Sequence, residues 1–177
     1  KENASTLFEE NSKKVAAALN NPNARTVTIA EGAYQLLKDF TDSYLEVYLT
    51  KNMPDLDKYY NLSSNARREN ERLAEAFAYQ TALAKSNKVK SVDSTLNIIE
   101  VTPVTDHVDE ILFYLQRTLH TDQGDENGGT WFLAHVADTT DGHKLLKLWI
   151  QDYAYEMMQN KLTKNYCSKN VELSKDI

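Results

Sequence analysis

The chain has 177 residues, of which 41% are hydrophobic and 26% charged, with 5 Gly and 3 Pro. This composition is typical of a globular domain and excludes the low-complexity and collagen-like classes. The net charge of −6 argues against a nucleic-acid partner, because nonspecific binding to phosphate backbones requires clustered Lys and Arg. No run approaches the roughly 18 apolar residues that a membrane-spanning helix needs. We therefore expect one domain over residues 1–177.

Two helical patterns occupy the N-terminal part of the chain. Residues 5–19 carry apolar side chains at helical spacing and end at Asn-Pro turn residues, so 1–27 is expected to hold a helix and a linker. Residues 28–31, Thr-Ile-Ala-Glu, fit a capping box that would start a second, longer helix. Its apolar stripe, at steps of three and four, is Ile29, Ala33, Leu36, Leu37, Phe40, Tyr44, Val47 and Tyr48.

A third helix is expected from about Asn65 to Ser86, after a connector that leaves room for one short helical turn. Its apolar side chains repeat at helical spacing, and the charged cluster Ala-Arg-Arg-Glu-Asn-Glu-Arg is typical of a solvated helix face.

From Lys88 the period of hydrophobicity changes to that of strands. Residues 88–104, 107–121 and 130–152 are rich in β-branched and alternating residues, and the last stretch contains a Thr-Thr-Asp-Gly turn. Three helices followed by about four strands with short connections indicate an α+β fold with an antiparallel sheet covered on one face. The tail, residues 154–177, lies outside a core expected at about 28–153.

One face of the second strand is the better core face. It carries Ile111, Phe113, Leu115, Arg117 and Leu119. A buried guanidinium without a partner is costly, so Arg117 is expected near the mouth of a cavity or beside a carboxylate.

The nearest approach to a metal motif is the acidic stretch at 119–136, with Asp122, Asp125, Glu126 and Asn127. Counted from Asp122, it lacks the calcium ligands or glycine required at three loop positions. We expect a metal-independent surface loop over Asp122–Gly129, and we expect the chain to use no metal and no cofactor. His120 and His135 flank this loop and could come close across the hairpin as a pH-sensitive pair.

Candidates for catalysis are few. The only cysteine, Cys167, lies in the polar tail, and no nucleophile elbow, P-loop or dinucleotide-binding motif occurs. An acid/base site remains conceivable if Asp39, Asp42, Asp109 or Glu110 faced a pocket that excludes water. Without an activated nucleophile or an oxyanion site, we expect this chain alone to catalyse nothing.

The last predicted hairpin resembles that of the nuclear transport factor 2-like, cystatin-like cone superfamily. The residues that carry the resemblance are Trp131, Phe132, Asp141, Gly142, Leu148, Trp149 and Ile150. Within that superfamily, the strand from Val92 to Thr102 is similar to one in the accessory domain that precedes amidase-type modules in secreted proteins of Gram-positive bacteria. The chain departs from the commonest arrangement because no clear hairpin strand lies between the second and third helices.

The resemblance implies three helices packed on a curved, cone-like sheet, in a noncatalytic domain of a secreted or cell-envelope bacterial protein. Such a domain would position or regulate an attached or neighbouring module, or bind a small molecule in its cone, at Phe40, Tyr44, Phe113, Arg117 and Trp131. It would reach a membrane only through an upstream anchor. The alternatives are a small ketosteroid-isomerase-like or dehydratase-like enzyme with an acid/base pair in the cone, and a periplasmic-type assembly subunit of a conjugation machine.

Overall fold

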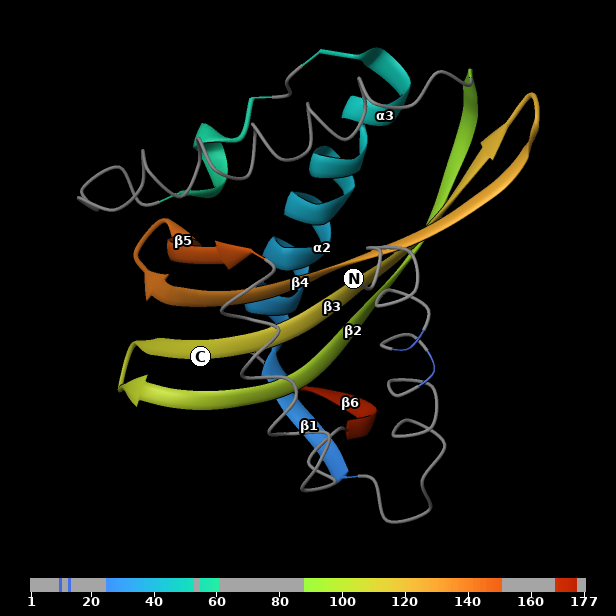
Figure 1. Cartoon of the computed structure of the whole chain (residues 1–177). Helices are drawn as coiled ribbons and strands as arrows, with labels where there is room; N and C mark the ends of the chain where they lie inside the picture. The colour runs from blue at the N-terminus through green and yellow to red at the C-terminus, as the bar shows by residue number, and fades with distance from the viewer. Residues whose placement is uncertain are drawn as a thin grey trace, which may run out of the picture.

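A computed structural model describes Glu10, Lys13 and residues 25–52, 55–60, 88–150 and 168–174. Figure 1 colours its elements from blue at the N-terminal end of the chain to red at the C-terminal end. They are β1 (Arg25–Ala30), α2 (Glu31–Leu45), α3 (Val47–Thr50), η1 (Asp57–Tyr59), β2 (Val89–Thr105), β3 (Val108–Thr121), β4 (Gly124–Thr139), β5 (Gly142–Ile150) and β6 (Ser168–Ser174).

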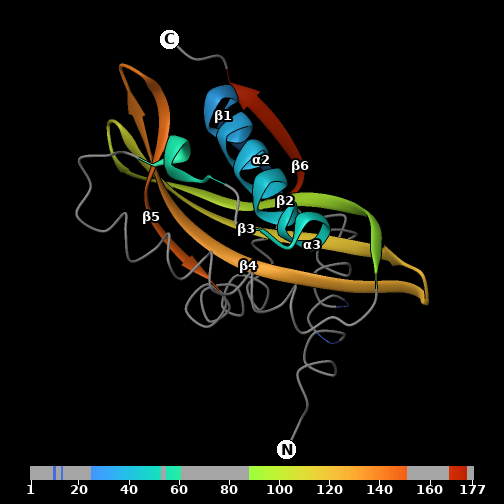
Figure 2. The same cartoon turned by 90° about the horizontal axis from the view of Figure 1, so that it is seen from above.

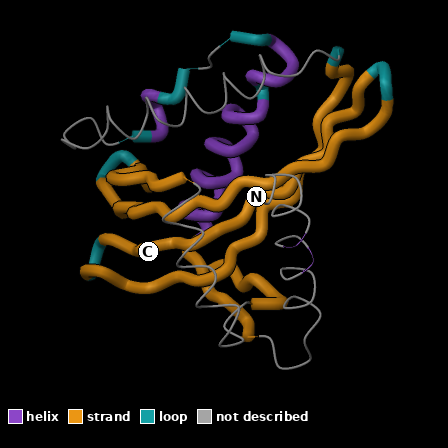
Figure 3. The backbone as a smooth tube through the Cα atoms, viewed as in Figure 1, coloured by secondary structure: helices purple, strands orange, loops and turns teal. Residues whose placement is uncertain are grey.

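Strands β2 to β5 form one antiparallel sheet in the order β2-β3-β4-β5. The long strands bend along their length, so the sheet curves around α2 (Figure 3). The prediction of an α+β fold with a curved antiparallel sheet of about four strands is therefore confirmed.

Two of the hairpins use the same turn. In Thr121–Gly124 and in Thr139–Gly142, the threonine hydroxyl donates to the glycine carbonyl at 2.6 Å and accepts an N–H at 3.1 Å. Both glycines have positive φ, 114° and 94°, which an L side chain rarely adopts. The predicted Thr-Thr-Asp-Gly turn is thus confirmed.

Helix α2 lies along one face of the sheet, beside β6 (Figure 2). Every residue of the predicted apolar stripe is buried, with exposed fractions between 0% and 8%. These side chains meet the alternate residues of β3, of which Ile111, Phe113, Leu115 and Leu119 are buried. The core face predicted for the second strand is therefore confirmed.

The predicted beginning of the second helix is wrong. Thr28 and Ile29 belong to β1, which pairs in parallel with β6, and the helix starts after Ala30 without a side-chain cap. The β-branched run Thr-Val-Thr-Ile favours a strand. Parallel pairing with β6 satisfies the backbone hydrogen-bonding groups of these residues in the strand conformation.

The expectation of three helices is not matched in the part of the chain that the structure describes. One long helix, α2, is seen there, followed by the single turn of α3. Of the helix expected at 5–19, only Glu10 and Lys13 are described, and both are helical, whereas the helix expected at 65–86 and most of the tail with Cys167 fall outside the described residues. No helix among the described residues is both long and apolar enough to span a bilayer.

Candidate functional site

Aromatic side chains fill the space between α2 and the sheet. Phe113 stacks on Phe132 with ring centroids 5.0 Å apart, and Phe132 meets Tyr44 edge-on at 5.5 Å and Phe40 at 6.3 Å. All four side chains are at most 2% exposed. The structure therefore brings the predicted residues Phe40, Tyr44 and Phe113 together, as parts of a packed interior.

Trp131 does not join them. Successive residues of a strand point to opposite faces, so Phe132 faces α2 while Trp131 lies on the other face of the sheet. There its indole stacks on the ring of Tyr114 at 3.8 Å, and both side chains are buried. Trp131 is thus not a cone-lining residue.

Arg117 points toward α3, where its partner among the described residues is a tyrosine. Its Nε donates to the Tyr48 hydroxyl at 3.2 Å, and its Cζ lies 4.8 Å from the centre of the Tyr48 ring. A Cβ atom at Gly128 would lie 2.2 Å from Nη1 of Arg117, so the guanidinium occupies the space that this glycine leaves. A cation on an aromatic ring is attracted by the ring's quadrupole, so the Tyr48 ring helps to stabilise a charge that has no ion pair within the described residues.

A groove of about 760 Å³ runs along the outside of α2 and is open to solvent. One wall is the exposed side of the helix, with Asp39 and Asp42. The opposite wall comes from η1 and the β4–β5 turn, with Lys58, Asp141 and Lys144. Carboxylates and ammonium groups therefore face one another across the groove.

Local hydrogen bonds hold the groove walls. Lys144 Nζ donates to the Lys58 carbonyl at 2.8 Å, which ties the β4–β5 turn to η1. The Ser43 and Tyr59 hydroxyls are 2.6 Å apart, which ties η1 to α2. Three segments that are distant in sequence thus make one surface.

The fold separates the four carboxylates proposed as acid/base candidates into two pairs, Asp39 and Asp42 on α2, and Asp109 and Glu110 on β3. Asp39 and Asp42 are exposed, and they accept hydrogen bonds from the side chains one turn before them at 2.9 Å. Burial raises the pKa of Asp109, and the nearby His143 opposes that rise. None of the described Asp, Glu or His residues is fully buried, although Oε2 of Glu100 and Oε2 of Glu126 are shielded from solvent.

Glu110 is the one candidate that meets a histidine. Its Oε2 lies 2.8 Å from Nε2 of His135 across the β3–β4 pair, on the sheet face that α2 does not cover. The His135 ring meets the Trp149 ring edge-on at 5.0 Å. The pair is partly buried, with side-chain exposures of 28% and 19%.

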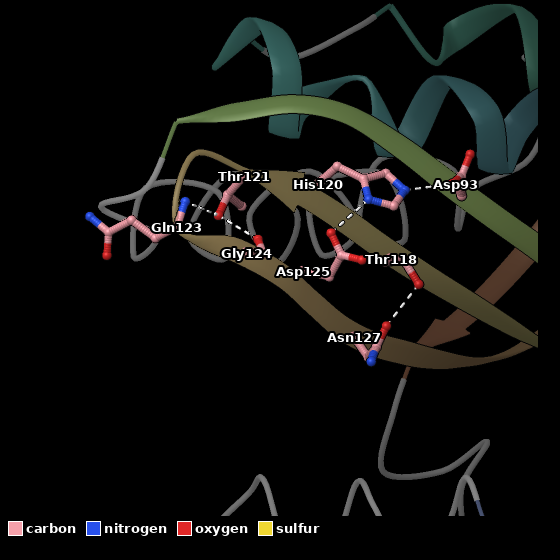
Figure 4. Close-up of polar contacts among 8 residues, drawn as sticks. All are labelled: Asp93, Thr118, His120, Thr121, Gln123, Gly124, Asp125 and Asn127. Carbon is pink, nitrogen blue, oxygen red and sulfur yellow. Dashed lines mark hydrogen bonds and ion pairs between the residues drawn. The ribbon is translucent and has the colours of Figure 1, made fainter.

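The expectation of a long loop after His120 is wrong. Strand β3 continues to Thr121 and β4 begins at Gly124, so Asp125, Glu126 and Asn127 belong to a strand (Figure 4). The side chain of Asn127 accepts from the Thr118 hydroxyl at 2.8 Å across the pair. The sequence Thr-Asp-Gln-Gly at this turn matches the Thr-Thr-Asp-Gly sequence of the next hairpin. A tight turn was predicted only for the second of them.

His120 and His135 are far apart. His120 lies opposite Asp125 near one end of the hairpin, and His135 lies opposite Glu110, ten residues back along β3. At ~3.4 Å per residue, this places them roughly 30 Å apart. The tight turn sets this register, so the two histidines form no pair.

His120 instead bridges two carboxylates from the neighbouring strands (Figure 4). Its Nδ1 lies 2.7 Å from Asp125 of β4, and its Nε2 lies 2.5 Å from Asp93 of β2. A neutral imidazole has one donor and one acceptor, whereas both nitrogens here face carboxylate oxygens, so the geometry requires the imidazolium. The hydrogen bond to Asp93, followed in size by the one to Asp125, raises the pKa of His120.

This bridge should make stability depend on pH. Because the folded-state pKa of His120 lies above its unfolded value of about 6.5, the stabilisation is complete below that pH and is lost as the pH rises through the folded-state pKa. His120→Gln should remove this decrease in the free energy of unfolding with rising pH. Urea unfolding at pH 5.5 to 8.5 measures the pH dependence. The control is His107→Gln, because His107 lies in the exposed β2–β3 turn. An equally steep decline in the His120→Gln protein would contradict the assignment.

Within the described ranges, no three His, Cys, Asp or Glu side chains converge as metal ligands would. The two nitrogens of His120 are each occupied by a different carboxylate, and those carboxylates lie on opposite sides of the ring. Metal independence and the absence of a cofactor stay predictions.

The sequence matches no protein-family model and no curated protein. Solved structures with a distant similarity include Aln2 from a Streptomyces species, with a TM-score of 0.46 at 10% identity over 75% of this chain and 98% of that one. A domain of unknown function with a cystatin-like fold from Nostoc punctiforme has a TM-score of 0.43 at 12% identity, over 75% and 86% of the two chains. A Novosphingobium aromaticivorans protein whose proposed identity is an aromatic ring hydroxylase has a TM-score of 0.40 at 12% identity, over 66% and 85%.

Proposed function

We propose that this chain is a noncatalytic binding domain that takes a charged, extended protein segment in the groove beside α2. One observation carries the proposal. The interior between α2 and the sheet is packed with aromatic rings, whereas the groove is open and lined by charges of both signs. The bound segment would come from a partner protein or from an attached module.

The groove has the properties of a recognition surface. Its volume falls in the usual range for binding sites, and side-chain hydrogen bonds hold both walls before any ligand arrives. A preformed surface loses less conformational freedom on binding, which favours affinity. Asp39 and Asp42 on one wall, with Lys58 and Lys144 on the other, suit a segment that alternates basic and acidic side chains.

The finer assignment is also a proposal. The resemblance of the last hairpin and of residues 92–102 supports an accessory domain that positions an amidase-type module in a secreted or cell-envelope bacterial protein. An assembly subunit of a conjugation machine would use the groove in the same way.

A library of random peptides displayed on phage tests the groove. We expect peptides with both Lys or Arg and Asp or Glu to be enriched on the wild-type domain. Asp39→Asn combined with Asp42→Asn should weaken their binding up to about tenfold, because each exposed charge pair contributes about 0.2–1 kcal/mol.

Asp106→Asn is the matched control, because Asp106 is an exposed carboxylate in the β2–β3 turn, outside the groove. It should leave binding unchanged. Peptides that bind the Asp39/Asp42 double variant as well as they bind the wild type would show that the groove is not the site.

The enzymatic alternative is supported by one observation, the partly buried pair of Glu110 and His135. A carboxylate that orients an imidazole is a common acid/base arrangement. The pair lies on the sheet face opposite α2, however, so it is not the pair inside the cone that a ketosteroid-isomerase-like or dehydratase-like enzyme would use.

A further inference from the structure

The solvent-shielded polar atoms without a hydrogen-bond partner among the described residues include two donors that come from facing elements. They are the Tyr44 hydroxyl of α2 and Nη1 of Arg117 on β3. Tyr44 is 2% exposed, and burial is the main reason that its pKa is raised well above its usual value, so it remains a neutral O–H donor. Leaving a buried donor unsatisfied is unfavourable, and native proteins seldom do so without a reason.

The two donors belong to one neighbourhood. The charge of Arg117 acts on Tyr44, where it opposes the rise in pKa, and Tyr48 lies beside both residues. Gly128 and the Tyr48 ring hold the guanidinium between them, so its Nη1 edge is fixed in position. A cationic N–H and a phenolic O–H, neither of them paired within the described part of the chain, suit an oxyanion.

We propose that Arg117 and Tyr44 bind the carboxylate of a small molecule between α2, α3 and β3. A carboxylate has two acceptor oxygens, one for each of the two donors, and it neutralises the guanidinium. Neither residue lines the groove, so this proposal and the proposed function stand or fall separately.

Acetate is the probe, titrated into the ¹⁵N-labelled protein at constant ionic strength against sodium chloride, with inorganic phosphate as a second anion. The amide signal of Gly128, which the guanidinium covers, should shift and saturate with acetate only. A linear shift shared with chloride, or saturation with phosphate but not acetate, would overturn the proposal.

Three variants separate binding from structure. Tyr44→Phe should weaken the affinity for acetate about tenfold, because the substitution removes one hydrogen bond to a charged group. Tyr34→Phe makes the same change ten residues earlier on α2 and should have no effect. Arg117→Lys keeps the positive charge but loses the planar edge, and should lose saturable binding.

Stability gives a second readout. Without acetate, Tyr44→Phe should raise Tm, because the variant removes a buried donor that lacks a partner among the described residues. A Tyr44→Phe protein with a lower Tm and unchanged acetate affinity would overturn the site. So would an experimental structure at saturating acetate that shows only water between the two side chains.

Discussion

Phe113→Ala and Phe40→Ala should each lower the free energy of unfolding by about 3–5 kcal/mol. Both side chains have no exposed surface, and both rings contact Phe132, in the centre of the core between α2 and the sheet. Truncation removes buried apolar surface and leaves a cavity that neighbouring rings cannot fill without losing their own contacts.

Urea unfolding followed by circular dichroism measures these losses. Val104→Ala is the control, because this side chain is 51% exposed near the end of β2 and should change stability by less than about 0.5 kcal/mol. Losses below about 1 kcal/mol at both Phe positions would show that the faces of α2 and β3 are assigned incorrectly.

The second large effect is expected at Gly129. A Cβ atom there would lie 2.0 Å from the hydroxyl oxygen of Tyr114 and 2.3 Å from its Cζ. The Tyr114 ring is fully buried and stacked on Trp131, so it has no room to move away. Gly129→Ala should therefore cost about 1–3 kcal/mol, the usual penalty for overpacking.

A double-mutant cycle identifies the cause. In a Tyr114→Leu background, the same Gly129→Ala change should cost markedly less, because the atoms it meets are gone. Urea unfolding measures the loss in the free energy of unfolding in each background. An equal loss in both would contradict the claim that the close approach of Tyr114 requires glycine at position 129.

The sheet could be predicted because its signals are local. Period-two hydrophobicity and turn residues mark each strand of the hairpins, and the strands pair with their neighbours in sequence. The pairing of β1 with β6 joins residues 25–30 to residues 168–174, and no local pattern predicts it. Only the β-branched run at 26–29 indicated that a strand, not a helix start, lay there.

The interior was predicted better than the groove beside α2. Helical spacing placed Phe40 and Tyr44 on the core face, and strand alternation placed Phe113 there. Trp131, which was proposed to line the cone, lies on the opposite face of the sheet from Phe132, because successive strand residues point to opposite faces. The paired glycines at 128 and 129 were interpreted as loop residues, although glycine in a strand also marks close approach.

The groove could not be found from the sequence. Its walls come from α2, η1 and the β4–β5 turn, and Lys58 and Lys144 meet only after folding. Each of its charged residues alone is an ordinary solvent-facing side chain.

Hydrogen–deuterium exchange with a peptide selected from the phage library tests the central claim most directly, that the charged protein segment binds at the groove. We predict that the peptide protects the amides of η1, of the β4–β5 turn around Asp141–Lys144 and of the exposed side of α2, and leaves the centre of β3 unchanged. Protection confined to the centre of β3 and β4, around Phe113 and Phe132, would contradict it.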